Sequence, residues 1–135
     1  MPRKVNIREV RHQELRSERT GEKYSLSAVL TEDLGLRDLF VHHEVIPPGR
    51  KASGAHFHTR REEMVVILQG EVVAWSNGAE VVLGVGDVVA FAPGEANAHC
   101  LRNDASAEAR VLIIASNPGE DDVGYVEMRE EAKIS

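Results

Sequence analysis

The sequence of 135 residues contains one cysteine, few aromatic residues and no long hydrophobic run. Cys100 has no partner for an internal disulfide, which is typical of a reducing compartment, and we therefore expect a cytoplasmic protein. No apolar segment approaches the roughly 20 residues that span a bilayer, and the basic start lacks the hydrophobic core of a signal peptide. These absences argue against a secreted or membrane-embedded protein.

An excess of positive charge is also lacking, because the formal net charge is -6. This balance gives no general attraction to nucleic acid or to anionic lipid, so we expect neither as a partner. Aromatic residues make up only 4% of the chain, and valine, isoleucine and leucine must supply most of the buried area. The length fits a single domain, with a core at about 36–116, an N-terminal arm and strands at 1–35 and a C-terminal tail at 117–135.

Short runs rich in valine and isoleucine alternate with glycine-containing turns at roughly ten-residue spacing, which predicts an all-β sandwich or barrel. These runs are EMVVILQ, EVVAWS, EVVLG, DVVAFA, AHCLRN and ARVLIIAS. Asn77-Gly78 between two of them suits a tight hairpin turn, because both residues tolerate positive φ angles. Upstream, KYSLSAVL and LRDLFVHHEVI predict two further strands. Residues 8–19 fit a short helix or an extended arm, and we favour the arm. The tail YVEMREEAKIS predicts a short helix or a partly disordered end.

The segment GAHFHTRREEMVVILQG (residues 54–70) carries the side chains that point most directly to chemistry. His56 and His58 are two residues apart, so in an extended strand they point to the same side. Glu63 opens the next strand, which is apolar on both faces. A carboxylate there is costly unless it is paired or bound to a cation, and the pattern therefore predicts a metal site.

A fourth ligand must come from another part of the chain, and the segment APGEANAHCLRN (92–103) offers His99. Three neutral imidazoles and one carboxylate suit one divalent transition metal ion: iron, manganese, nickel, zinc, cobalt or copper. A single cysteine excludes the closed thiolate sites of structural zinc. Two alternatives remain open at this point, Glu62 in place of Glu63 and Asn97 in place of His99.

Together these residues resemble the two motifs of the cupin family. The first motif is Gly, five residues, His-x-His, three or four residues, Glu, six residues and Gly, and residues 49–70 are similar, with six residues after the first glycine. The second is Gly, five residues, Pro-x-Gly, two residues, His, three residues and Asn, which residues 86–103 resemble. Ala92 replaces the proline, and four residues separate Gly94 from His99. The resemblance implies a double-stranded β-helix, a jelly-roll-like cupin barrel, whose metal ligands are His56, His58, Glu63 and His99.

The resemblance also implies a metal-dependent enzyme of dioxygenase or isomerase type that acts on a small polar or sugar-like molecule. The alternatives are a non-catalytic barrel that binds or senses a small ligand, and a structural barrel without a functional metal. His43 lies among alternating apolar residues, and we consider it as an acid/base or substrate-contact residue inside the barrel, or as a buried structural histidine. We also expect a homodimer, because small cupins commonly pair or exchange their early strands and a free strand edge invites association.

Overall fold

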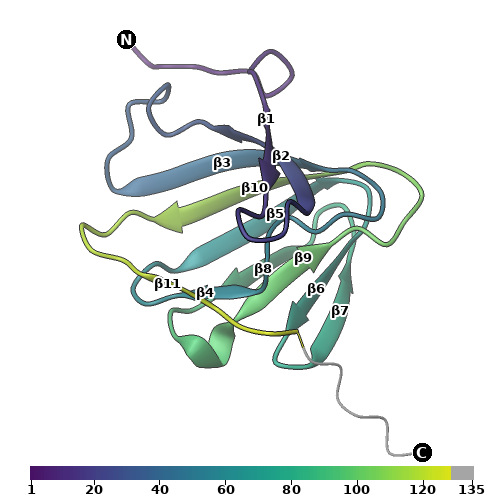
Figure 1. Cartoon of the computed structure of the whole chain (residues 1–135). Helices are drawn as coiled ribbons and strands as arrows, with labels where there is room; N and C mark the ends of the chain where they lie inside the picture. The colour runs from purple at the N-terminus through teal and green to yellow at the C-terminus, as the bar shows by residue number, and fades with distance from the viewer. Residues whose placement is uncertain (129–135) are drawn as a thin grey trace, which may run out of the picture.

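The structure is a computed structural model that describes residues 1–128, and it contains two antiparallel β-sheets (Figure 1). The six-stranded sheet contains, in spatial order, β1 (Gln13–Arg16), β2 (Lys23–Val29), β3 (Leu39–Ile46), β10 (Ala109–Ser116), β5 (Glu63–Gln69) and β8 (Val88–Phe91). The five-stranded sheet contains β11 (Val123–Tyr125), β4 (His56–His58), β9 (His99–Arg102), β6 (Val72–Ser76) and β7 (Ala79–Leu83). Within residues 1–128 the one helical element is the 3₁₀ turn η1 (Glu95–Asn97), and no helix there could cross a membrane. The all-β prediction is confirmed.

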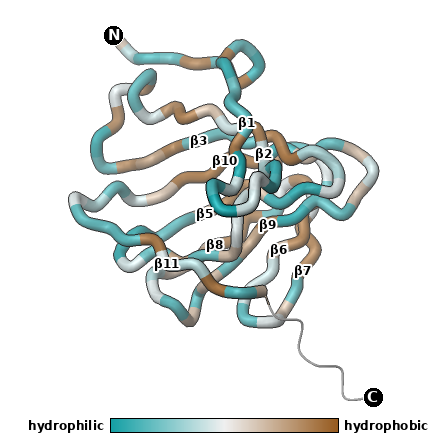
Figure 2. The backbone as a smooth tube through the Cα atoms, in the orientation of Figure 1, coloured by the Kyte–Doolittle hydropathy of each residue, from teal (hydrophilic) through white to brown (hydrophobic). Residues whose placement is uncertain are grey.

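Aliphatic side chains fill the space between the two sheets. Val111 and Ile113 on β10 lie opposite Ile67 and Val65 on β5, so the two strands turn the same face inward. Figure 2 shows hydrophobic segments recurring along the strands of both sheets. The core cluster consists of Ile46, Ala52, Val65, Ile67, Val72, Ala74, Leu83, Phe91, Leu101, Ala109, Val111 and Ile113. Burial of such side chains contributes about 25 cal/mol per Å², which favours closure of one sheet on the other.

The outer face of the six-stranded sheet is covered as well. Residues before β2 lie on the side of the molecule away from the five-stranded sheet (Figure 1). Their apolar side chains pack, with those of the loop after β2, on a second cluster that is centred on Ala28, Leu30 and Val41. Part of the predicted extended arm is a short strand, because β1 pairs with β2. Strand β3 is consequently buried on both faces.

Two ends of the five-stranded sheet show what local sequence predicts and what it does not. Asn77 and Gly78 have φ angles of 50° and 79° and join β6 to β7 in the predicted two-residue turn. At the other end, β11 pairs with β4, and this strand was not predicted from the sequence. The tail at 125–135 was expected to form a short helix or to be partly disordered, and residues 129–135 lie outside the described part of the chain.

Candidate metal centre

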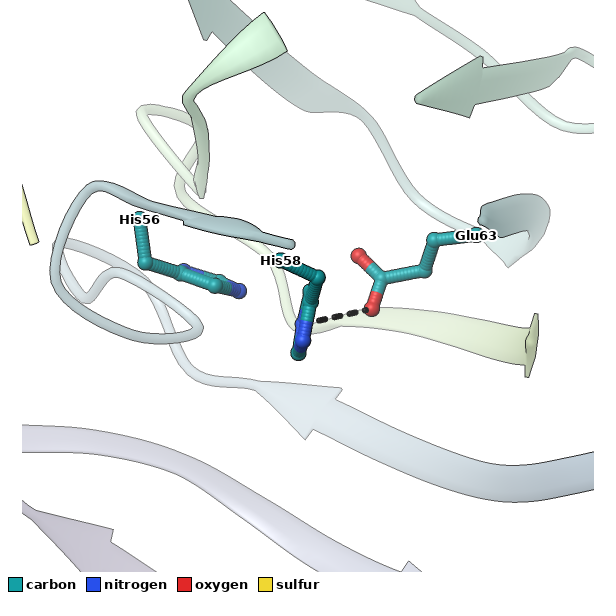
Figure 3. A group of neighbouring side chains, drawn as sticks. All are labelled: His56, His58 and Glu63. Atoms are coloured by element: carbon teal, nitrogen blue, oxygen red, sulfur yellow. Dashed lines mark ion pairs between the residues drawn. The ribbon is translucent and has the colours of Figure 1, made fainter. Parts of the chain in front are cut away.

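His56 and His58 on β4 and Glu63 at the start of β5 converge on one point (Figure 3). Each residue offers a ligand atom, and these atoms all lie within 4.8 Å of one another. The two imidazole rings are nearly perpendicular, with centroids 5.2 Å apart. The His-x-His spacing on an extended strand therefore brings both rings to the same side, as the two-residue period requires.

His99 lies next to this group, on β9, which pairs with β4. It is directly opposite His56 in the strand register, and the two ring centroids are 4.9 Å apart. Its Nε2 lies 2.9 Å from Oε1 of Glu63. We call His56, His58, Glu63 and His99 the candidate metal centre; it joins the two sheets, because Glu63 alone comes from the six-stranded one.

The two alternative ligands point elsewhere. Asn97 lies in η1, and its side-chain amide donates a hydrogen bond to the carbonyl of Pro93. Glu62 is exposed, and its backbone N–H donates to the hydroxyl of Ser116. The structure thus brings together the four residues that the family resemblance implies, and neither alternative joins them.

Each imidazole of the centre is held at its Nδ1 by an acceptor. His56 Nδ1 lies 2.9 Å from the carbonyl oxygen of Gly54, and His99 Nδ1 lies 2.9 Å from that of Asn97. His58 Nδ1 lies 2.7 Å from a carboxylate oxygen of Asp121. A neutral imidazole has one N–H, and an acceptor at Nδ1 places it there, so the lone pair of Nε2 is free to bind a cation.

The two contacts of the His99 ring indicate which ligand the centre could bind. Acceptors face both of its ring nitrogens, the carbonyl of Asn97 at Nδ1 and the carboxylate of Glu63 at Nε2. A neutral imidazole can satisfy only one of them by donation. A metal ion held by Nε2 and the carboxylate would satisfy the second, so the donor set fits a divalent transition metal of the kind that binds imidazole and carboxylate.

The electrostatics of the centre agree with metal-binding protonation states. Burial lowers the pKa of His56 below its ordinary value, which favours the neutral imidazole. Burial alone would raise the pKa of Glu63, but the hydrogen bond with His99 and the neighbouring histidines leave it below its ordinary value. A neutral imidazole and an ionised carboxylate are the forms that bind metal.

Two residues that sequence reasoning missed support the centre. Oδ1 of Asp121 accepts the backbone N–H groups of Arg60 and Arg61, at 2.9 Å each, while Oδ2 meets His58. Phe91 on β8 stacks flat on the ring of His99, with centroids 3.7 Å apart and planes 5° apart. Asp121 lies 63 residues from His58 along the chain and Phe91 only eight from His99, and no local pattern marks either of them.

Of the two readings of His43, the structure contradicts a side chain inside the barrel and agrees with a buried histidine. His43 lies opposite Ala28 on β2 and Leu112 on β10, which belong to the outer cluster. It is fully buried there, and its Nδ1 lies 2.7 Å from Nε2 of His12. Both faces of β3 are covered, so residue alternation could show which residues share a face but not which face is inside.

The inward histidine of β3 is its neighbour, His42. It lies opposite Ile113 of the core, and its Nδ1 is 3.9 Å from Oε2 of Glu44. Glu44 is 4% exposed and accepts a hydrogen bond of 2.8 Å from the hydroxyl of Ser25. Burial raises the pKa of Glu44 to about 7 and lowers the pKa of His42 to about 4. A second polar pair therefore lies inside the barrel.

Comparison with known proteins identifies the class. Residues 42–115 match the cupin domain family. This range covers more than half of the 135 residues, and the chain therefore belongs to the cupin family. Its two facing antiparallel sheets are the double-stranded β-helix of that family, as predicted.

Several relatives carry names from carbohydrate chemistry. A β-D-galactosidase of Mycobacterium tuberculosis is 38% identical over 74 residues, which are 55% of this chain and 60% of that protein. A solved sugar phosphate isomerase of Silicibacter pomeroyi is 28% identical, with a TM-score of 0.73, over 77% of this chain and 66% of that one. A solved candidate sugar phosphate isomerase of Acidithiobacillus ferrooxidans is 27% identical, with a TM-score of 0.78, over 88% and 76%. The matched region thus spans less than two thirds of the first two proteins, at 60% and 66% of their lengths.

Proposed function

We propose that this protein is a metal-dependent isomerase of a small sugar-like molecule, an aldose or ketose with adjacent carbonyl and hydroxyl groups. The observation that carries the proposal is the candidate metal centre, in which three imidazoles present Nε2 beside one buried carboxylate. The names of the relatives support the substrate class, since each of the three refers to sugar chemistry.

The four side chains of the centre would hold one divalent transition metal ion through the Nε2 atoms and the Glu63 carboxylate. Such an ion supplies Lewis acidity, which polarises a bound carbonyl oxygen and acidifies the neighbouring C–H bond. The chain itself favours the neutral form of His56 through burial, orients the three imidazoles through the Nδ1 acceptors and holds Phe91 against His99. These features suit binding of adjacent oxygens of a small substrate.

Isomerisation is favoured over oxygenation by the polar interior beyond the centre. Moving a proton between adjacent carbons requires a proton-accepting group near the substrate and no second substrate. The inner face of β3 carries an imidazole and a carboxylate, His42 and Glu44, in addition to the four metal-binding side chains. A binding protein would not need such a pair.

The test uses the protein loaded with Mn²⁺ and offered D-ribose 5-phosphate, D-glucose 6-phosphate and D-galactose in D₂O. Proton NMR is expected to show deuterium incorporation at C2 and formation of the ketose with at least one sugar. Protein stripped with EDTA and the Glu63→Gln variant are expected to be inactive. Consumption of dioxygen without exchange would instead indicate a dioxygenase, and retention of a sugar without turnover would indicate a binding protein.

A further inference from the structure

The inner face of β3 leads directly from the candidate metal centre. Phe40 lies opposite Ala115 of β10, and Ala115 lies opposite Glu63, so Phe40 is level with the carboxylate of the centre. His42 and Glu44 follow on the same face at two-residue steps. They therefore occupy the next two levels on the inner face of the six-stranded sheet, on β3, which is separated from β5 by β10.

One ring nitrogen of His42 lies near Glu44, and the other has no partner within the described residues. Its Nδ1 side faces Oε2 of Glu44 at 3.9 Å, and Oε1 of Glu44 is fixed by Ser25. Within residues 1–128, Nε2 of His42 has no hydrogen-bond partner. This atom is also not fully buried. The side chain is 16% exposed, so it is not closed off from solvent.

Burial of Glu44 at this position costs free energy of folding. Its side chain is 5% exposed, and no lysine or arginine of the described chain lies within ion-pair distance of it. Burial of a carboxylate without a cation costs several kcal/mol unless hydrogen bonds compensate, and Ser25 provides only one. Such unpaired buried groups gather at functional sites, where an apolar side chain would be more stable.

We infer that His42 is the base that moves the substrate proton between C1 and C2, and that Glu44 is a positioning residue that holds its imidazole. This inference rests on the proposed isomerase function. In the forward direction the C2–H bond breaks as an N–H bond forms at Nε2, and the electron pair passes through a C1–C2 double bond to the C1 oxygen. The proton at Nε2 is then returned to C1, and the proton of the C2 hydroxyl passes through solvent to the C1 oxygen. An aldose becomes a ketose, with atoms and electrons balanced.

The experiment compares His42→Gln with His43→Gln, since the two histidines are adjacent but lie on opposite faces of β3. With Mn²⁺ and the sugar that shows exchange, His42→Gln is expected to lower kcat by about 10²–10⁴-fold with little change in KM. His43→Gln is expected to keep kcat near the wild-type value, and thermal melts show whether each variant folds. Glu44→Gln should lower kcat less than His42→Gln does, again at unchanged KM, and Glu44→Asp should recover part of the loss.

A second readout does not depend on turnover. Diethyl pyrocarbonate modifies accessible neutral imidazoles, so in Co²⁺-loaded protein mass spectrometry should find modified His42 and unmodified His43. The Co²⁺ absorption spectrum of His42→Gln should match that of the wild type. Lack of modification at His42, or wild-type kcat in His42→Gln, would overturn this inference alone. A metal-loaded wild type that is inert toward all three sugars would overturn the proposed function, and this inference with it.

Discussion

Three groups face the Nδ1 atoms of the imidazoles in the centre: two backbone carbonyls and the carboxylate of Asp121, which alone is charged. Replacement of Asp121 with alanine is expected to weaken Mn²⁺ binding by about 10–100-fold, because the His58 ring loses the partner that fixes its orientation and raises the basicity of Nε2. Isothermal titration measures the affinity. The matched control is Asp122→Ala, since Asp122 makes its hydrogen bonds to Thr59 through its backbone. Equal affinities in the two variants would contradict the orienting role of Asp121.

His43 is also expected to make the stability of the protein depend on pH. Burial, followed by the proximity of His12, lowers the pKa of His43 to about 4, against an ordinary value of 6.5. Between these values the unfolded chain binds more protons than the folded chain does at this site. The contribution of His43 to stability is therefore complete above pH 6.5 and is lost as pH falls toward 4.

The measurement is urea unfolding of metal-free protein at several pH values from 7 to 5. The free energy of unfolding of the wild type should fall more steeply with decreasing pH than that of His43→Gln, by up to about 1 kcal/mol per pH unit. The opposite effect of Glu44, whose pKa is raised, is present in both proteins and cancels in the difference. Parallel curves would show that His43 does not titrate in this way.

How far the sequence predicts individual residues depends on how the chain brings them together. His56, His58 and Glu63 lie close together in the sequence, on two successive strands, so the strand period and the cost of a buried carboxylate were sufficient to single them out. Asp121 meets His58 across 63 residues of sequence, and such a contact exists only once the sheet is formed. His42 and His43 share one strand, and only the packing of both faces determines which one points inward.

At the scale of the element, the turn after β5 depends on Gly70. Its φ angle is +77°, and a Cβ atom there would lie 2.7 Å from the carbonyl oxygen of Glu108 and 3.0 Å from Cα of Ala109. Gly49 has a similar φ angle of +79° but nothing within 4 Å of such an atom. The two glycines therefore share the conformational requirement and differ in steric contact.

Gly70→Ala is consequently expected to be more destabilising than Gly49→Ala. Gly49→Ala should cost about 1–2 kcal/mol for the left-handed backbone alone. Gly70→Ala adds an overlap with backbone atoms, which cannot rotate away as a side chain can. Urea unfolding of both variants measures the difference, and equal losses of stability would mean that the β5–β6 turn shifts freely to accommodate a methyl group.

Elements were predicted well where a long periodic run lies between turn residues. The hairpin of β6 and β7 is such a case, because Asn77-Gly78 specifies the turn and the valines specify the strands. Strand β11 has three residues and no such signal, and it forms because the edge of β4 offers it a partner. The outward direction of the His43 side chain also depends on a distant contact. The N-terminal segment covers a face of β3 that sequence alone would leave open.

At the scale of the whole molecule, one edge strand of the five-stranded sheet offers an apolar surface that a second copy could cover. Strand β7 ends the five-stranded sheet, and Val81, Val82 and Val85 on it and after it are 51%, 59% and 68% exposed. Exposed apolar edge strands favour association, and we predict a homodimer that buries this edge. Sedimentation velocity at micromolar concentration should show a dimer for the wild type and a monomer for Val82→Lys. Val29→Lys, at a site that is 53% exposed on β2, is the control; a monomeric wild type would refute the prediction.

The candidate metal centre also links stability to metal across the whole barrel. Glu63 belongs to the six-stranded sheet and the three histidines to the five-stranded sheet, so a bound ion would join the two layers at one end of the core. A ligand that binds only the folded state stabilises it by about 2.7 kcal/mol at one hundred times its Kd. Thermal melts should therefore show a higher Tm with saturating Mn²⁺ than with EDTA.

In Glu63→Gln the Tm difference between Mn²⁺ and EDTA should largely disappear. In Glu62→Gln the difference should remain, because the side chain of Glu62 is exposed to solvent. If Glu62→Gln abolished the shift and Glu63→Gln preserved it, the ion would have to bind outside the group of four residues, and the two sheets would be held together by the aliphatic core alone.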